Sequence, residues 1–380
     1  MTNPRRMQMA TAGQGEVQGY ELWTWGVGTN GGLGHGNETN LSSPVQVGSE
    51  AEWVHAYANE YNMQGIKTDG TLWTWGLGDN GRNGTNNTTS YSSPVQVGSK
   101  TNWVEISGEA CKIGRDSAGN IFTWGKNTNG ALGNGNTSDN NNPVQVGTDT
   151  WISISASVNE MGAVRSDGTL WTWGLNDEGQ LGLGNTTNYS SPVQVGSLTS
   201  WESFHSLQLS SGAIKTDGTL WTWGRNHQGQ QGHGNTTDSS SPVQVGSLTN
   251  WGGGQVRTTP GNTWRAIKTD GTLWFWGYDG RGMSGNGSTT GSSSPVQTGS
   301  LTNWYNGSFA DGYRNMGTGK QDRVVVKSDG TLWSWGRNQF GQHGVGDTTG
   351  RSTPNQVGSE TIWFNAGGGT YMSAALKDVS

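Results

Sequence analysis

Six histidines are the side chains of this chain best suited to metal binding or acid–base chemistry: His35, His55, His205, His227, His233 and His343. Of these, His35 and His233 each lie ten residues after the second Trp of a Trp-x-Trp-Gly sequence, but in distant parts of the chain. A metal site needs several ligands that converge on one point. We therefore expect surface-loop histidines and no metal site.

Recurring aspartates and glycines could be mistaken for catalytic or cofactor-binding groups. Asp-Gly occurs at Asp69, Asp167, Asp217, Asp270 and Asp329, where its regular return indicates tight turns rather than a converging pair of acids. Gly26–Gly31 and Gly76–Gly81 match Gly-x-Gly-x-x-Gly, yet no helix pattern follows to bind a dinucleotide. The lone Cys111 is expected to be buried. The sequence predicts a protein that is not an enzyme and has no cofactor.

Composition excludes further classes of protein. The chain has 380 residues, 65 of them Gly and 21 Trp, and a net charge of −6. The mild acidity argues against general nucleic-acid binding, which requires basic clusters. Without a run of 18 apolar residues the sequence predicts no membrane insertion. Residues 1–18 lack the apolar core of a signal peptide, which leaves a virion or the cytoplasm as the expected location.

The sequence repeats seven times, about every 50 residues. Trp-x-Trp-Gly occurs six times and Phe122-Thr-Trp124-Gly replaces it once. A Pro-Val-Gln-Val-Gly sequence or a near variant follows each copy, starting at Pro44, Pro94, Pro143, Pro192, Pro242, Pro295 and Pro354. A further Trp comes next, at Trp53, Trp103, Trp151, Trp201, Trp251, Trp304 and Trp363. Only Trp264 falls outside these series.

Each unit has the pattern of about four short strands. Residues 71–75 alternate with period two, after an Asp-Gly turn and before a glycine-rich loop. Four strands in 50 residues are typical of a propeller blade. The chain enters mid-unit near Gly19 and ends mid-unit at residues 371–378, so strands from both termini complete one blade. We predict an all-β, seven-bladed β-propeller at 19–380, preceded by an N-terminal arm at 1–18.

Residues 217–226 (Asp-Gly-Thr-Leu-Trp-Thr-Trp-Gly-Arg-Asn), with Gly229 and Gly232 after them, resemble the repeat of the regulator-of-chromosome-condensation family. The resemblance extends over about 19–380 and implies a seven-bladed propeller closed by both ends. Members include a GTPase exchange factor that docks on chromatin and a bacterial β-lactamase inhibitor. The exchange factor's inserted wedge and basic tail have no counterpart here beyond Arg5 and Arg6. The uniform units are similar to those of bacterial and phage members.

Differences between units indicate where a partner could bind. Four residues after each Trp-Gly vary and are expected to line one rim, as at 126–129, 175–178, 225–228, 278–281 and 337–340. The stretches from Trp251 to Asp270 and from Trp304 to Asp329 are longer than their counterparts. Because aromatic residues and Arg predominate at binding hot spots, these stretches supply our candidate binding residues: Trp264, Arg265, Tyr305, Phe309, Asp311, Tyr313 and Arg314.

These observations favour a non-enzymatic binding or structural propeller, such as a phage virion (tail or capsid-associated) or surface attachment protein. Its loops would contact a partner protein or a host surface glycan, and the arm at 1–18 would anchor it or join copies into a homo-oligomer. The alternative is a soluble inhibitor or regulator of one protein. A GTPase exchange factor ranks third.

Overall fold

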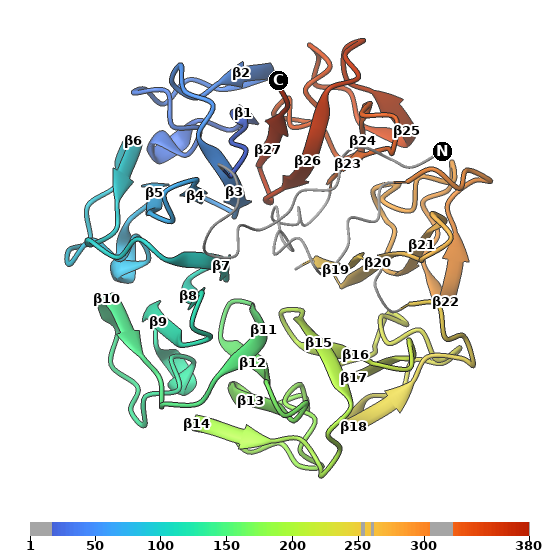
Figure 1. Ribbon diagram of the computed structural model, residues 1–380. Helices are drawn as coiled ribbons and strands as arrows, with labels where there is room; N and C mark the ends of the chain where they lie inside the picture. Colours follow the sequence, from blue (N-terminus) through green and yellow to red (C-terminus); the bar gives the residue numbers. More distant parts are fainter. Residues whose placement is uncertain (1–16, 252–254, 260–261, 305–321, 380) are drawn as a thin grey trace.

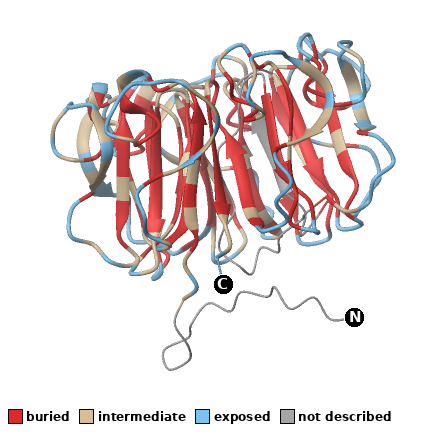
Figure 2. Cartoon of the chain, turned by 90° about the horizontal axis from the view of Figure 1, so that it is seen from above, coloured by how far each residue is buried: buried red, intermediate tan, exposed pale blue. Residues whose placement is uncertain are grey.

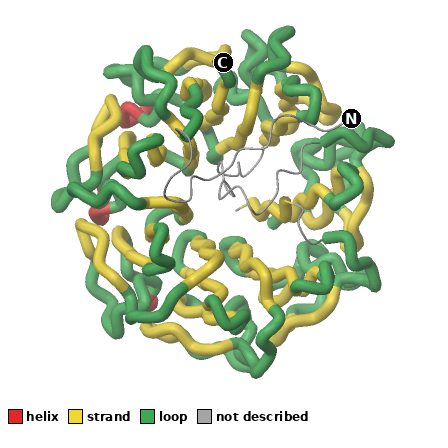
Figure 3. Tube along the Cα trace, viewed as in Figure 1, coloured by secondary structure: helices red, strands yellow, loops and turns green. Residues whose placement is uncertain are grey.

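The computed structural model describes residues 17–251, 255–259, 262–304 and 322–379. Their strands form seven antiparallel sheets arranged as a ring (Figure 1). Each sheet is one blade, and the loops lie at both ends of the strands and around the outside (Figure 3). The prediction of an all-β seven-bladed propeller is therefore confirmed.

The blades are listed here with their strands in order from the ring axis outward. Blade 1 has β26 (Trp363–Gly368), β27 (Met372–Lys377), β1 (Glu21–Gly26) and β2 (Leu41–Gln46); blade 2 has β3 (Trp53–Ala58), β4 (Asn62–Lys67), β5 (Leu72–Gly76) and β6 (Tyr91–Gln96); blade 3 has β7 (Trp103–Ser107), β8 (Cys111–Asp116), β9 (Ile121–Gly125) and β10 (Asn140–Gln145); blade 4 has β11 (Trp151–Ala156), β12 (Glu160–Arg165), β13 (Leu170–Gly174) and β14 (Tyr189–Gln194). Blade 5 has β15 (Trp201–Ser206), β16 (Ser210–Lys215), β17 (Leu220–Gly224) and β18 (Ser239–Gln244); blade 6 has β19 (Gln255–Thr259), β20 (Thr263–Ile267), β21 (Leu273–Gly277) and β22 (Ser292–Gln297); blade 7 has β23 (Asp322–Val326), β24 (Leu332–Gly336) and β25 (Arg351–Gln356). Short 3-10 helices η1 (Thr29–Gly31), η2 (Asp79–Gly81) and η3 (Thr128–Gly130) lie in the loops of the first three blades.

The ring closes through one blade built from both ends of the chain. Strand β1 pairs with β27 along its whole length, from Glu21 opposite Lys377 to Gly26 opposite Met372. The side-chain nitrogen of Gln18 also donates a 3.0 Å hydrogen bond to Asp378. This is the closure expected from the half-units at the two ends, and it joins β26, β27, β1 and β2 in one four-stranded sheet.

The core consists of seven separate apolar clusters, one between each pair of neighbouring blades. The blades appear in Figure 2 as buried strands beneath exposed loops. The second Trp of each Trp-x-Trp is at most 1% exposed, as for Trp173 and Trp223. Six of these seven indole nitrogens donate to carbonyl oxygens of the preceding blade, for instance Trp223 to Gln180 at 2.9 Å. The exception is Trp75, whose indole nitrogen has no partner among the described residues. The tryptophans therefore join blades by hydrogen bonds as well as by packing.

A glycine in each loop makes this contact between blades possible. Gly182 has a φ of +73°, and a Cβ there would lie 2.7 Å from the indole nitrogen of Trp223. Only glycine combines that conformation with such a close approach. The glycines of these loops are therefore needed for blade packing.

The first Trp of each pair belongs to a polar chain at the Asp-Gly turn. Trp221 donates to the hydroxyl of Thr219 at 2.9 Å, and that hydroxyl donates to Asp217 at 2.6 Å. The same chain occurs in blades 2, 4, 6 and 7. The turn aspartates are turn formers, as predicted.

Among the described residues no helix is long and apolar enough to cross a bilayer.

Candidate functional site

Trp264 and Arg265, two of the candidate binding residues, are buried in a strand, so the prediction that they are available to a partner is wrong. Both belong to β20, where Trp264 pairs with Trp276 across the sheet. The two indole rings are stacked with centroids 6.0 Å apart, and Trp264 is 0% exposed. Arg265 is 7% exposed. Trp264 therefore cannot contact a partner unless the core between blades 5 and 6 opens.

The other five candidate residues lie outside the part of the chain that the structure describes. They are Tyr305, Phe309, Asp311, Tyr313 and Arg314. Their role in binding stays a prediction.

The histidines divide into two groups, and the expectation of surface positions is wrong for one of them. His55 is 1% exposed and His343 is 0% exposed. Burial, followed by the nearby charge of Arg351, lowers the pKa of His343 to about 4, so this ring is neutral at pH 7. His35, His205, His227 and His233 are at least partly exposed.

One histidine lies beside two carboxylates. Ligand atoms of Glu178, His227 and Asp238 all lie within 4.8 Å of one another, and His227 is 3.2 Å from Asp238. They come from the loops of blades 4 and 5, with His227 and Asp238 exposed. Exposed acidic groups gather in this way without a metal, so the arrangement alone assigns no metal site.

The variable residues after Trp-Gly are only partly available to a partner. The second residue of each stretch is buried in the five units from blade 3 to blade 7. Asn176 shows why: its side chain donates to the carbonyl oxygens of Asn185 and Thr187 and accepts from the amide of Leu181. These residues hold the loop together, so the prediction that they line a rim is wrong at this position.

Aromatic side chains gather at one end of the ring, where these loops lie. We call this end the loop face; it carries the loops after Trp-Gly and the turns between the first two strands of each blade. Here Tyr371 of blade 1 lies 5.6 Å from the ring of Tyr61 in blade 2 and 5.5 Å from Phe340 in blade 7. All three are partly exposed. This aromatic cluster therefore spans three blades at the point where the ring closes.

Polar groups surround the aromatic cluster. The guanidinium of Arg337 lies 5.9 Å from the ring centre of Phe340. Burial, with Glu60 and Tyr371 nearby, raises the pKa of Tyr61 to about 12, so its hydroxyl keeps its proton. Aromatic side chains with a polar surround are typical of protein-binding hot spots.

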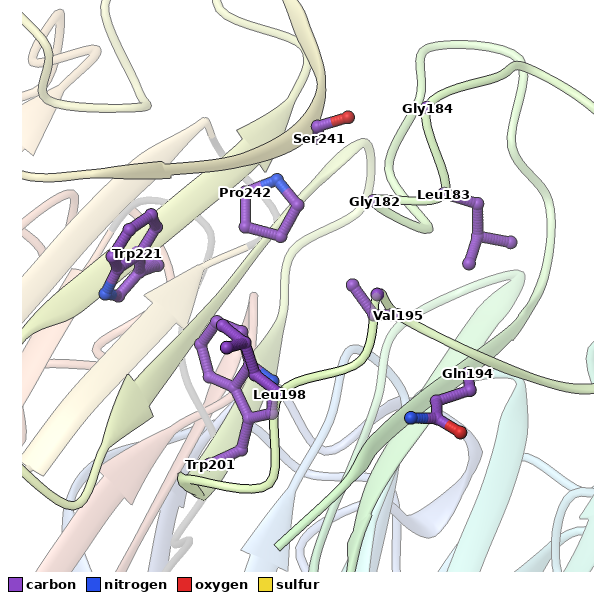
Figure 4. Close-up of a pocket in the computed structure, with 11 residues that line it drawn as sticks. Gly182, Leu183, Gly184, Gln194, Val195, Leu198, Trp201, Trp221, Ser241 and Pro242 are labelled. Carbon is purple, nitrogen blue, oxygen red and sulfur yellow. The ribbon is translucent and has the colours of Figure 1, made fainter.

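Pockets also occur on the outer rim of the ring, between neighbouring blades. Figure 4 shows the one between blades 4 and 5, with a volume of about 330 Å³. Trp201, Trp221, Leu198, Val195 and Pro242 form its apolar walls. Similar pockets lie between blades 1 and 2 and between blades 5 and 6.

Several titratable groups are buried inside the blades. Burial raises the pKa of the Cys111 thiol to about 12, and the sulfur lies 3.2 Å from the carbonyl oxygen of Ser157. A thiol in that state is a poor nucleophile, which agrees with the predicted buried position. Glu160 and Lys112 are likewise buried in separate blades, and burial opposes the charge of each: it raises the pKa of Glu160 and lowers that of Lys112.

Comparison with known proteins assigns these repeats to a family. A model of the regulator of chromosome condensation (RCC1) repeat matches residues 21–58, 69–108, 118–159, 167–213, 217–252 and 329–376. The chain belongs to the RCC1 repeat family. The expected family is therefore confirmed, while a bacterial or phage origin stays a proposal.

Relatives share the RCC1 fold at low sequence identity. The chain is similar to Prp20p of Saccharomyces cerevisiae, with a TM-score of 0.81 and 17% identity over 96% of this chain and 93% of that one. Human WBSCR16 gives a TM-score of 0.78 and 16% identity over 95% and 99%. The ultraviolet-B receptor UVR8 of Arabidopsis thaliana is 29% identical over 108 residues, 28% of this chain. That match spans only 23% of the receptor's length.

The RCC1 match also shows where this chain departs from its family. Residues 253–328 fall outside the matched segments, and they include the two longer stretches noted in the sequence. In the structure this region still supplies the four strands of blade 6 and the whole of β23. The fold thus persists where the repeat sequence diverges most.

Proposed function

We propose that this RCC1 repeat propeller is a non-enzymatic binding protein that docks a protein partner on its loop face. The aromatic cluster of Tyr61, Phe340 and Tyr371 is the observation that supports the proposal most strongly. It offers apolar ring surface and tyrosine hydroxyls together, the combination that is enriched at binding hot spots.

The placement of the two chain ends favours this orientation. Gln18 and Asp378 meet at the end of the ring that carries the Asp-Gly turns, because Tyr20 bridges to Trp53 and Asp378 donates to Ile362 there. We call this end the turn face. An arm leaving from the turn face could attach the ring while the loop face stays available.

On this basis the finer role we propose is a virion or surface attachment component of phage or bacterial origin, anchored through residues 1–18. The partner on the loop face would be a protein, with a host surface glycan as the other class to test. The competing role is a soluble inhibitor or regulator of one protein. The structure of Prp20p is reported with its binding to Gsp1p and histones, so an exchange-factor role remains a third outcome of the test.

The test is purification of the protein from its source, with mass spectrometry of the proteins that accompany it. Three variants are compared with the natural chain: deletion of residues 2–16, Phe340→Ser with Tyr371→Ser on the loop face, and Ile362→Ser on the turn face. Ile362 is 37% exposed and serves as the matched control for loss of an exposed apolar side chain.

We expect the natural chain to accompany virion or surface proteins, the deletion to abolish that association, and the loop-face variant to lose one specific partner. A soluble, stoichiometric complex that survives the deletion would replace attachment by the inhibitor or regulator role. Faster nucleotide release from a captured GTPase would establish the exchange-factor role. If the loop-face variant keeps every partner, docking on the loop face is wrong.

A further inference from the structure

An ion pair recurs where the linker before each blade meets the end of its second strand. Glu50 pairs with Lys67 at 2.8 Å, Asp149 with Arg165 at 2.6 Å, and Glu360 with Lys377 at 2.9 Å. Blade 3 has the same pair with the charges exchanged, Lys100 with Asp116 at 2.8 Å. Four blades therefore place opposite charges at these two positions.

Three consecutive blades break this rule in the same way. The linker position is Leu198 before blade 5, Leu248 before blade 6 and Leu301 before blade 7, and these side chains are 46%, 44% and 43% exposed. The position at the end of the second strand is still a lysine, Lys215 in blade 5 and Lys327 in blade 7. Among the residues that the structure describes, these two lysines have no ion-pair partner.

Each of these lysines lies over tryptophan rings, as the ion-paired Lys67 and Lys377 also do. The ammonium of Lys215 is 3.7 Å from the ring centre of Trp221 and 5.1 Å from that of Trp201. Lys327 lies 3.6 Å from Trp333 and 5.0 Å from Trp304. A cation–π contact of this kind stabilises an ammonium only in part, so a carboxylate would still be attracted to it.

Two of the three exposed leucines, Leu198 and Leu248, open onto rim pockets. Leu198 and Trp221 line the pocket between blades 4 and 5 (Figure 4), and Leu248 and Trp274 line the one of about 540 Å³ between blades 5 and 6. The corresponding pocket between blades 1 and 2 is lined by Glu50 and Lys67. The chain thus supplies its own carboxylate to one pocket and leaves an apolar wall in the others.

Charge is also distributed unevenly around the ring. Residues 198–358, which make up blades 5 to 7, contain 12 Lys and Arg against 9 Asp and Glu. The rest of the chain contains 10 against 19. The stretch of sequence that forms blades 5 to 7 is therefore relatively richer in basic residues than the rest of the chain.

We infer that the rim of blades 5 to 7 is a docking surface for an acidic peptide segment that places large apolar side chains in the pockets and carboxylates beside the lysines. The segment would provide the carboxylate that Glu50, Asp149 and Glu360 provide within the chain. The two adjacent pockets allow one segment to bind at more than one point, which strengthens weak individual contacts. This surface is separate from the loop face and does not depend on the function proposed above.

The experiment uses the full chain and two fluorescein-labelled peptides, four repeats of Phe-Glu-Gly and four repeats of Phe-Lys-Gly, in fluorescence-anisotropy titrations. The triple variant Leu198→Glu, Leu248→Glu, Leu301→Glu gives the three linkers the acidic residue found elsewhere. Ile152→Glu, at another exposed apolar position, is the matched control. A second variant, Glu360→Leu, gives the linker before blade 1 the leucine of the docking surface.

We expect the Glu peptide to bind with a Kd below about 1 mM, at least tenfold more tightly than the Lys peptide. The triple variant should weaken binding at least tenfold, Ile152→Glu should not, and Glu360→Leu should strengthen it. No binding of the Glu peptide, equal binding of both peptides, or binding unchanged in the triple variant would overturn the inference. If the triple variant fails to fold, the gain in Glu360→Leu decides, and its absence contradicts the proposal.

Discussion

The indole nitrogen of Trp25 donates a 2.8 Å hydrogen bond to the carbonyl oxygen of Gln342, 317 residues further along the chain. This is the same contact that Trp223 makes to Gln180 between two blades in the middle of the sequence. The junction between the first and last parts of the chain is therefore built like the interface between blades 4 and 5.

We expect Trp25→Ala and Trp223→Ala to reduce the free energy of unfolding by similar amounts, about 3–5 kcal/mol each, because each removes a fully buried ring. Chemical denaturation of the two variants measures this. A loss under about 1 kcal/mol for Trp25→Ala alone would mean that the terminal junction is not packed as described.

The turn aspartate should contribute through its hydrogen bonds. Asp217 accepts from both the amide and the hydroxyl of Thr219. Asp217→Ala leaves these donors without that acceptor, so we expect a loss of about 1–2 kcal/mol in unfolding free energy. Glu38→Ala, in an exposed loop, is the control and should change stability by less than about 0.5 kcal/mol. Equal effects of the two substitutions would contradict the structural role of the turn.

His343 should make the protein less stable in acid. Its pKa is about 4 in the folded ring and near 6.5 in the unfolded chain. Between these values the unfolded state binds a proton that the folded state does not, so stability falls as the pH drops from 6.5 to 4, by up to about 3 kcal/mol. His343→Leu, which copies Leu181 of blade 4, should lose this part of the pH dependence. Thermal unfolding from pH 4 to 7 compares them; parallel profiles would refute the prediction.

Glu160 should lower the stability of the protein as the pH rises, whereas His343 lowers it as the pH falls. It is 1% exposed, accepts from Ser211 at 3.4 Å, and burial raises its pKa well above the usual range. The folded state therefore keeps its proton while the unfolded state releases it above about pH 4.5, so the natural chain loses stability as the pH rises. Glu160→Gln removes that loss, so we expect the variant to be more stable than the natural chain at pH 7. A less stable variant at pH 7 would show that Glu160 is charged in the fold.

The repeats were sufficient to predict the fold, because each unit contains both its strand pattern and its turn signals. The half-units near Gly19 and residues 371–378 also predicted the closing blade. Trp264 was predicted to be a binding residue because it lies in the longer stretch between Trp251 and Asp270. The extra residues of that stretch come before Trp264, which precedes Asp270 by the same six residues as Ser211 precedes Asp217. Trp264 therefore occupies the position of a strand residue.

The surface features needed three-dimensional contacts that the sequence does not reveal. Tyr61, Phe340 and Tyr371 are far apart along the chain and meet only when the ring closes. The buried position of Asn176 depends on the loop folding back on its side chain. In contrast, the leucines at 198, 248 and 301 stand out once the linkers are aligned, and the ion pairs of the other four blades show what they replace.

Docking of a protein on the loop face is tested most directly by calorimetric titration of the partner that accompanies the natural chain. Phe340→Ala should raise the Kd at least tenfold, the effect typical of a hot-spot aromatic side chain, and Ile362→Ala on the turn face should leave it unchanged. An unchanged Kd for Phe340→Ala, or a loss confined to Ile362→Ala, would contradict the loop face as the binding surface.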